Sequence, residues 1–91
     1  KDIMYCEAES NYTKVVLNNG KKELVAKVLK DIDEALSGDD FFRIHNSYLI
    51  NINYIKKYVR GEGGYVIMDD DTNIGISRSR RQAFMEMFSK F

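Results

Sequence analysis

Three polar segments of the chain carry the side chains best suited to contacting a nucleic acid. They are residues 9–12, 43–47 and 77–81, and each lies next to a run with strand character. An asparagine can bond adenine at N6 and N7 together, and an arginine can bond guanine at O6 and N7. Neighbouring serine, lysine and arginine side chains can bond phosphates and fix the register of a protein on a duplex. The residue types therefore indicate recognition rather than catalysis.

Each segment also has an ordinary structural explanation. Residues 77–81 (SRSRR) can be the solvated basic start of a helix, although positive charge there opposes the helix dipole. Ser79 with Gln82 resembles a capping box, and a helix that begins near Ser79 would offer backbone N–H groups to a phosphate. The turn at residues 45–47 can equally cap a helical run over 48–52. The residue types alone therefore predict a β-rich module and do not identify its ligand.

Little in the sequence could perform catalysis. His45 is the only imidazole and Cys6 the only thiol, and Cys6 lies inside the apolar run 3–6, where a cysteine is usually an inert core residue. Residues 69–71 (DDD) lack the ligand spacing of a calcium loop, and residues 61–64 (GEGG) lack the Lys-Ser/Thr of a phosphate loop. We expect no enzyme, no metal and no cofactor, and we expect His45 to be structural, with its ring bonding within the polar turn.

Composition limits the class of protein. Ninety-one residues make one domain, 1–91, and a single cysteine fits a reducing compartment. No apolar run approaches the roughly 18 residues of a membrane span, and no signal peptide is evident, so we expect a cytoplasmic protein with no membrane partner.

Net charge argues against nucleic acid at first sight. It is zero, with 14 basic and 14 acidic side chains, whereas phosphate binding needs clustered positive charge. Residues 1–40, however, hold 6 lysines against 9 acids (−3), and residues 41–91 hold 8 bases against 5 acids (+3). The basic half contains two of the three polar segments, which is compatible with one basic face.

Hydrophobic patterning predicts a strand-dominated domain with one short central helix and one C-terminal helix. Strands are expected at residues 3–6, in a hairpin over 12–26 with Asn19-Gly20 as a two-residue turn, and at 54–60, 65–68 and 72–77. Apolar residues at helical spacing predict a helix over 28–36 that stops at Ser37-Gly38, and a terminal helix with a stripe at Phe84, Met87, Phe88 and Phe91. In residues 41–53 the apolar residues follow neither the helical spacing nor the alternation of a strand.

The segment at residues 42–51 (FRIHNSYLIN) resembles the signature of the LytTR family of DNA-binding domains. Residues 3–8 with 11–13, the helix near 29–36, Tyr54-Ile55, and residues 76–78 before a terminal helix resemble the rest of the family pattern in the right order. The resemblance covers essentially the whole chain. It implies an elongated arrangement of short antiparallel sheets, unlike a helix-turn-helix, whose loops enter successive major grooves on one face of duplex DNA.

The resemblance also implies site residues and partners. The family's base contacts fall here on Asn46, on Arg78 and, in a variable loop, on or beside Asn11. We expect phosphate contacts from five neighbours: Lys14, Arg43, Ser47, Arg80 and Arg81. Such domains are commonly the output half of bacterial two-component response regulators that control transcription, behind a receiver domain that this chain does not include, and two copies bind paired direct repeats. The alternative is a protein-interaction module that pairs through an edge strand such as residues 65–68.

Overall fold

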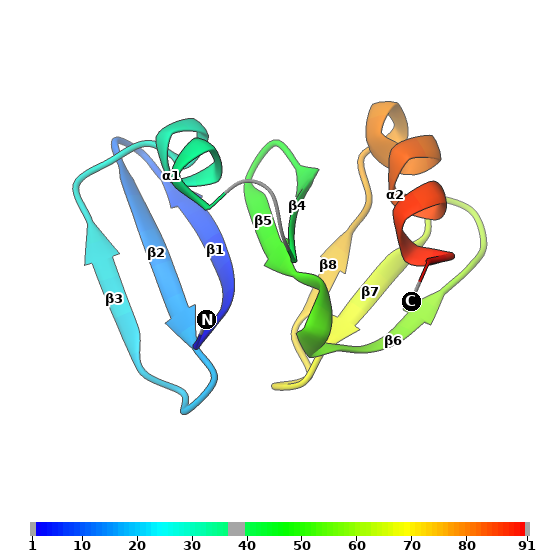
Figure 1. Cartoon of the computed structure of the whole chain (residues 1–91), viewed down its shortest axis with the longest axis horizontal. Coiled ribbons are helices and arrows are strands. Elements are labelled where there is room, and N and C mark those ends of the chain that lie inside the picture. The colour runs from blue at the N-terminus through cyan, green and yellow to red at the C-terminus, as the bar shows by residue number, and fades with distance from the viewer. Residues whose placement is uncertain (1, 37–39, 91) are drawn as a thin grey trace.

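The computed structural model describes residues 2–36 and 40–90. Within these ranges eight strands form two antiparallel sheets, accompanied by two α-helices and two 3₁₀ turns (Figure 1). The strands are β1 Ile3–Glu9, β2 Tyr12–Leu17, β3 Lys22–Val25, β4 Phe41–His45, β5 Tyr48–Asn51, β6 Ile55–Val59, β7 Tyr65–Met68 and β8 Asn73–Gly75; the helices are α1 Leu29–Ala35 and α2 Arg81–Phe88, and the 3₁₀ turns are η1 Ile52–Tyr54 and η2 Arg78–Arg80.

The five-stranded sheet has the order β3-β2-β1-β5-β4, and the three-stranded sheet has the order β6-β7-β8. Two strands far apart in sequence, β1 and β5, pair at the centre of the larger sheet, with Cys6 opposite Leu49. The molecule measures 34 × 26 × 23 Å along its principal axes. The predicted mostly-β fold of short antiparallel sheets is therefore confirmed, and no described segment forms a helix-turn-helix.

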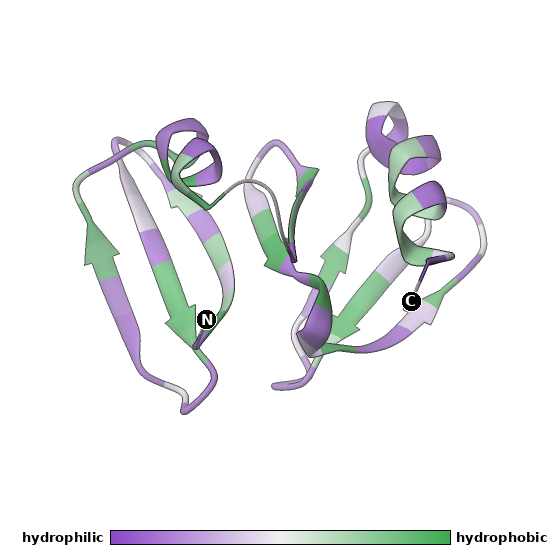
Figure 2. Ribbon diagram, in the orientation of Figure 1, coloured by the Kyte–Doolittle hydropathy of each residue, from purple (hydrophilic) through white to green (hydrophobic). Residues whose placement is uncertain are grey.

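The larger sheet is apolar on both faces. Cys6 and Leu49 point towards α1 and form one buried cluster with Leu29, whereas Tyr5 and Ile50 point towards the smaller sheet and α2. Figure 2 shows hydrophobic residues along strands of both sheets and hydrophilic residues along much of both helices. Strands covered on both faces show no alternation of apolar and polar residues, which is why residues 41–53 matched no period.

The segment at residues 41–53 is a hairpin of β4 and β5 followed by η1, and the alternative of a helical run over 48–52 is wrong. Its last strand residue, Asn51, is buried at 3% exposure. The Asn51 amide donates to the Ile3 carbonyl oxygen at 2.9 Å and accepts from the Asn53 N–H at 3.0 Å. These bonds satisfy the buried amide and anchor the change from strand to 3₁₀ turn.

The first hairpin is confirmed, but its turn differs from the predicted two-residue form. Only Gly20 has a positive φ, at 90°, whereas that turn type needs positive φ at both central positions. The Gly20 N–H bonds the Leu17 carbonyl at 3.0 Å, and the Leu17 N–H bonds the Lys21 carbonyl at 2.8 Å. The chain therefore closes through a longer turn in which glycine takes the left-handed position. Strand β1 also runs three residues further than predicted, to Glu9, which leaves a loop of only Ser10 and Asn11.

The two predicted helices are present. The helix α1 spans Leu29–Ala35, and its expected stop at Ser37-Gly38 lies outside the described residues. The stripe of α2 packs through Phe84, Met87 and Phe88 on the core between the sheets, and Phe91 lies outside the described residues. No helix among residues 2–36 and 40–90 is long and apolar enough to cross a membrane.

The Cys6 thiol is expected to resist alkylation in the folded protein. Its side chain is fully buried, and this burial raises its pKa to about 12, so almost no reactive thiolate exists at neutral pH. Iodoacetamide labelling at pH 7–8, followed by mass spectrometry, should show unlabelled native protein and complete labelling in urea. Rapid labelling without denaturant would contradict this packing of β1 against β5 and α1.

Candidate nucleic-acid interface

The three polar segments lie along one edge of the molecule. They are the β1–β2 turn with Asn11, the β4–β5 turn with Asn46, and η2 with Arg78 at the start of α2. In Figure 1 they follow one another along the upper edge, roughly parallel to the longest axis. Asn11, Asn46 and Arg78 are all exposed. The fold thus brings the three predicted base-contact residues to a common edge, on three separate turns.

Backbone hydrogen bonds join these segments to one another. The Ala8 N–H of β1 bonds the Ser47 carbonyl at 2.8 Å, and the Ser77 N–H, just before η2, bonds the Ile44 carbonyl of β4 at 3.0 Å. The β4–β5 turn is therefore tied to both neighbours. Because each bond joins backbone groups, the relative placement of the three segments does not depend on flexible side chains.

Arg43 and His45 hold the β4–β5 turn in shape. Arg43 donates from Nη2 to the Asn46 carbonyl at 2.7 Å and from Nε to the His45 carbonyl at 3.1 Å. The His45 Nδ1 accepts from the Ser47 N–H at 3.0 Å, and the ring meets Tyr48 edge-on at 6.1 Å. The ring hydrogen bond predicted for His45 within the turn is therefore present. Arg43, a predicted phosphate contact, uses two of its donor atoms inside the protein.

Asn46 itself is held by an arginine from the next segment. Arg80 donates from Nη1 to Asn46 Oδ1 at 3.1 Å, across 34 residues of sequence. Partial burial, and then the nearby Arg80 guanidinium, lower the pKa of Arg43, against an opposing effect of Asp33. Two guanidinium groups therefore lie close to Asn46, and in the described part of the chain neither forms an ion pair with a carboxylate.

The junction with α2 differs from the expected capping box. The chain first forms η2 at Arg78–Arg80, and α2 begins at Arg81, without a side-chain cap from Ser79 or Arg80. With Ser79 as the cap the helix would start at Arg80, so α2 starts one residue later than expected. The Ser77 N–H, two residues after β8 ends, is bonded to the Ile44 carbonyl. Arg78 is left exposed at the head of the turn. Arg81 is half-buried, and its Nε is buried without a hydrogen-bond partner in the protein.

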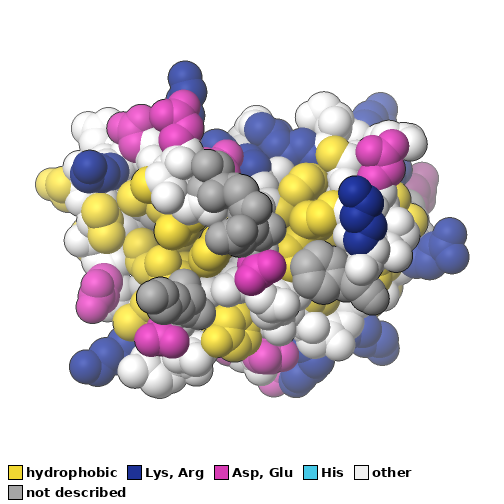
Figure 3. All heavy atoms as spheres, in the orientation of Figure 1, with side chains coloured by type: hydrophobic (Ala, Val, Ile, Leu, Met, Phe, Trp, Pro, Cys, Tyr) yellow, Lys and Arg dark blue, Asp and Glu magenta, His cyan; other side chains and the backbone are white. Residues whose placement is uncertain are grey.

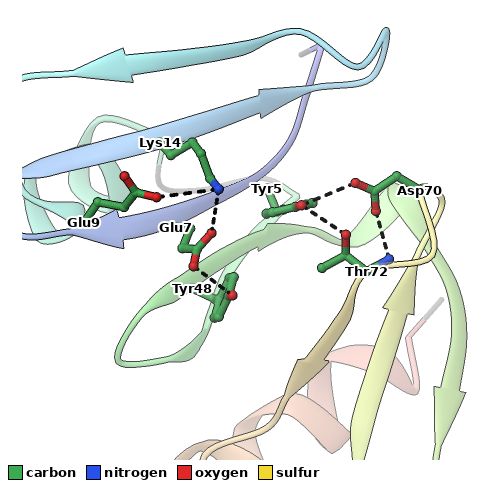
Figure 4. Close-up of polar contacts among 7 residues, drawn as sticks. All are labelled: Tyr5, Glu7, Glu9, Lys14, Tyr48, Asp70 and Thr72. Carbon is green, nitrogen blue, oxygen red and sulfur yellow. Dashed lines mark hydrogen bonds and ion pairs between the residues drawn. The ribbon is translucent and has the colours of Figure 1, made fainter.

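Beside the first loop, Lys14 lies in a polar network on the larger sheet (Figure 4). Its ammonium is 3.1 Å from Glu7 Oε1 and 3.6 Å from Glu9 Oε2, and the bond to Glu7 is the main cause of its raised pKa. Tyr48 donates to Glu7 Oε2 at 3.0 Å; burial and then this bond raise the pKa of Tyr48. Two of the three N–H donors of Lys14 therefore face carboxylates, which leaves one for a phosphate.

A second polar contact in Figure 4 joins the two sheets. The Tyr5 hydroxyl of β1 lies 3.3 Å from Asp70 Oδ2 and 3.1 Å from Thr72 Oγ1, in the turn between β7 and β8. Burial is the largest cause of the raised pKa of Tyr5. The acidic run 69–71 thus belongs to a turn that supports the sheet interface, and among the described residues no group of three metal-binding side chains is present.

Charge is distributed unevenly over the visible face. In Figure 3 acidic side chains gather over α1, whereas Lys and Arg side chains lie at the upper edge between α1 and α2. The acids on α1 are Asp31, Asp33 and Glu34, in agreement with the acidic excess of the first forty residues. The basic edge coincides with the β4–β5 turn and the start of α2.

Sequence reasoning missed the side-chain links within this edge. The Arg80–Asn46 bond and the Glu7–Tyr48 bond connect residues 34 and 41 positions apart. Pairing of β1 with β5 places Glu7 opposite Tyr48, and pairing of β1 with β2 places it opposite Lys14, which lets the three side chains meet on one face. These contacts could have been predicted only from the register in which the strands pair.

The larger and smaller sheets with two helices define a mostly-β module. A LytTr DNA-binding domain from Bacillus cereus has the same fold, with a TM-score of 0.82 and 24% identity over 99% of this chain and 83% of that one. The sequence also matches the family model of the LytTr DNA-binding domain over residues 1–89. The chain belongs to the LytTR family of DNA-binding domains.

Two curated relatives are transcriptional regulators. The chain is 28% identical over 90 residues to the heme-containing CO-sensing transcriptional regulator RcoM 1 of Paraburkholderia xenovorans, covering 96% of this chain and 33% of that protein. It is also 28% identical over 68 residues to the CO-responsive transcriptional regulator RcoM of Rhodospirillum rubrum, covering 74% of this chain and 28% of that protein. The chain thus spans about a third of the length of these relatives.

Proposed function

We propose that residues 1–91 form a single domain that binds duplex DNA sequence-specifically by inserting loops into successive major grooves. The observation that carries this proposal is the common edge of Asn11, Asn46 and Arg78, on three exposed segments along the longest axis. That axis measures 34 Å, close to the length of one turn of B-DNA, about 34–36 Å. Loops arranged in this way can meet one face of a duplex over about one helical turn.

In this proposal the side chains at the edge make two kinds of contact, with bases and with phosphates. Asn46 and Arg78 contact base edges in the major groove, and Asn11 contacts the bases nearest the first loop. Ser47, Arg80 and Arg81 lie beside them and contact phosphates. Arg43 and Lys14 add phosphate contacts through the donors that they do not use within the protein. Because net charge is zero, base contacts supply more of the affinity than in a strongly basic DNA-binding protein.

The wider context is also part of the proposal. We infer a bacterial, cytoplasmic transcription regulator of the two-component type, with this domain as output behind a receiver domain, acting as two copies on paired direct repeats. The family resemblance supports this arrangement, while the names of the two RcoM relatives indicate a CO-sensing input in those proteins. The coding sequence upstream of Lys1 decides between them: a receiver domain supports the proposal, and a haem-binding sensor domain contradicts it.

Selection of bound duplexes from a random library tests the DNA-binding proposal. The isolated domain is expected to enrich a single motif, and a duplex with two copies of that motif spaced by one helical turn, about 10–10.5 base pairs, should bind more tightly than one spaced by an extra half turn. Arg60→Ala removes an exposed charge from the end of β6 and serves as a control that should enrich the same motif.

Failure to enrich a motif would favour the protein-interaction alternative. The strand suggested for that role does not fit it, because β7 (Tyr65–Met68) is the central strand of the smaller sheet and pairs with both β6 and β8. The backbone groups of β7 are already used in these two pairings. Such an interaction would have to use β3, β4, β6 or β8 at the sheet edges.

A further inference from the structure

The bond between Arg80 and Asn46 fixes which side of the Asn46 amide faces outward. A guanidinium group only donates hydrogen bonds, so its partner at 3.1 Å must be the amide oxygen, Oδ1. The amide nitrogen, Nδ2, then lies on the other branch of the side chain. Arg43 holds the backbone of the same residue by its carbonyl at 2.7 Å. The orientation of Asn46 is therefore set from both its side chain and its backbone.

This arrangement changes what Asn46 can recognise. An asparagine with a free amide bonds adenine twice, by accepting from N6 and donating to N7. Here Arg80 takes one of the two lone pairs of the accepting oxygen, so the N6 amino group of adenine would have to share this oxygen with a positively charged donor. Guanine instead offers two acceptors, O6 and N7, in the major groove. The remaining N–H groups of Asn46 and Arg80 are donors, which match the two acceptors of guanine better than the mixed pattern of adenine.

We propose that Arg80 determines base specificity by binding the Asn46 amide oxygen, so that the pair contacts bases through its N–H donors and selects guanine over adenine. The inference rests on the proposed base contact of Asn46, and it replaces the phosphate contact expected of Arg80. Neither Arg43 nor Arg80 forms an ion pair with a carboxylate among residues 2–36 and 40–90, so no acidic side chain there competes for these donors. Removing Arg80 frees Oδ1 and restores the pattern that suits adenine.

The test measures dissociation constants for four duplexes that differ only at the base pair where Asn46→Ala relaxes the selected motif. Wild-type protein is expected to prefer guanine to adenine there by about 5- to 150-fold, the range for one good bidentate contact. Arg80→Met keeps the length of the side chain without its donors, and it should bring this ratio to one or below. Arg60→Met, a matched change at an exposed arginine away from the edge, should leave the ratio unchanged.

Because the ratio compares two duplexes with the same variant, it does not depend on the folded fraction of that variant. A uniform loss of affinity in Arg80→Met, with the guanine preference intact, would show that Arg80 only binds phosphate and would overturn the inference. A wild-type preference for adenine would overturn it as well. If Asn46→Ala relaxes no position of the motif, the proposed base contact itself fails, and the inference built on it falls with it.

Discussion

Replacing Phe84 with alanine is expected to lower the free energy of unfolding by about 3–5 kcal/mol. Phe84 is fully buried, and its ring lies 5.9 Å from Phe42 of β4, 5.3 Å from Tyr58 of β6 and 5.3 Å from Phe88. It thus joins α2 to both sheets. Alanine would remove these contacts and leave a cavity that rigid strands cannot close.

Urea denaturation followed by circular dichroism measures this loss. A domain of this size has a total stability of about 5–14 kcal/mol, so a large part of it depends on one ring. Glu86→Ala, at an exposed position on the same helix, should change the free energy of unfolding by less than about 0.5 kcal/mol. A loss below about 1 kcal/mol in Phe84→Ala would contradict the docking of α2 between the sheets.

The double variant Asn46→Ala, Arg78→Ala is expected to lose about 2–6 kcal/mol of binding free energy on the selected duplex, because each side chain supplies about 1–3 kcal/mol of base discrimination. The upper end of this range applies if the two effects add, and the two single variants measure the coupling between them. Binding to random duplexes should change little, and the salt slope should stay the same, because neither side chain is assigned a phosphate contact.

Fluorescence anisotropy at several salt concentrations, with selected and random duplexes, measures both effects. Arg60→Ala again provides the control, since it removes one charge and leaves the edge intact. Specific binding should then fall only in the double variant. Equal losses on selected and random duplexes would identify Asn46 and Arg78 as phosphate contacts and exclude them from base recognition.

Local patterns predicted most elements of the fold. The helix α1, the stripe on α2, and the strands β6, β7 and β8 follow from apolar spacing and turn residues within short windows. The hairpin of β4 and β5 was missed because a strand buried on both faces, such as Tyr48–Asn51, shows no alternation. The start of α2 was misplaced by one residue because the chain first forms the 3₁₀ turn η2, which the local capping pattern does not indicate.

The sequence indicated which residues form the candidate site, but it did not indicate the hydrogen bonds between them. Asn46, Arg78 and Asn11 were identified by residue type and resemblance, and the fold places all three on one edge. The roles of Arg43 and Arg80 depend on how close the β4–β5 turn lies to η2, which no local pattern specifies. Distances between turns follow from the pairing of β1 with β5 and from the packing of α2.

The central pairing of β1 with β5 has a consequence for how the protein is made. A ribosome releases β1, β2 and β3 first, and β1 then exposes an unpaired edge until residues 48–51 have left the exit tunnel. At about 5–20 residues per second this interval lasts a few seconds. During that time apolar side chains of β1 lack their partners, so a nascent chain halted before β5 is the species in which aggregation or chaperone binding should concentrate.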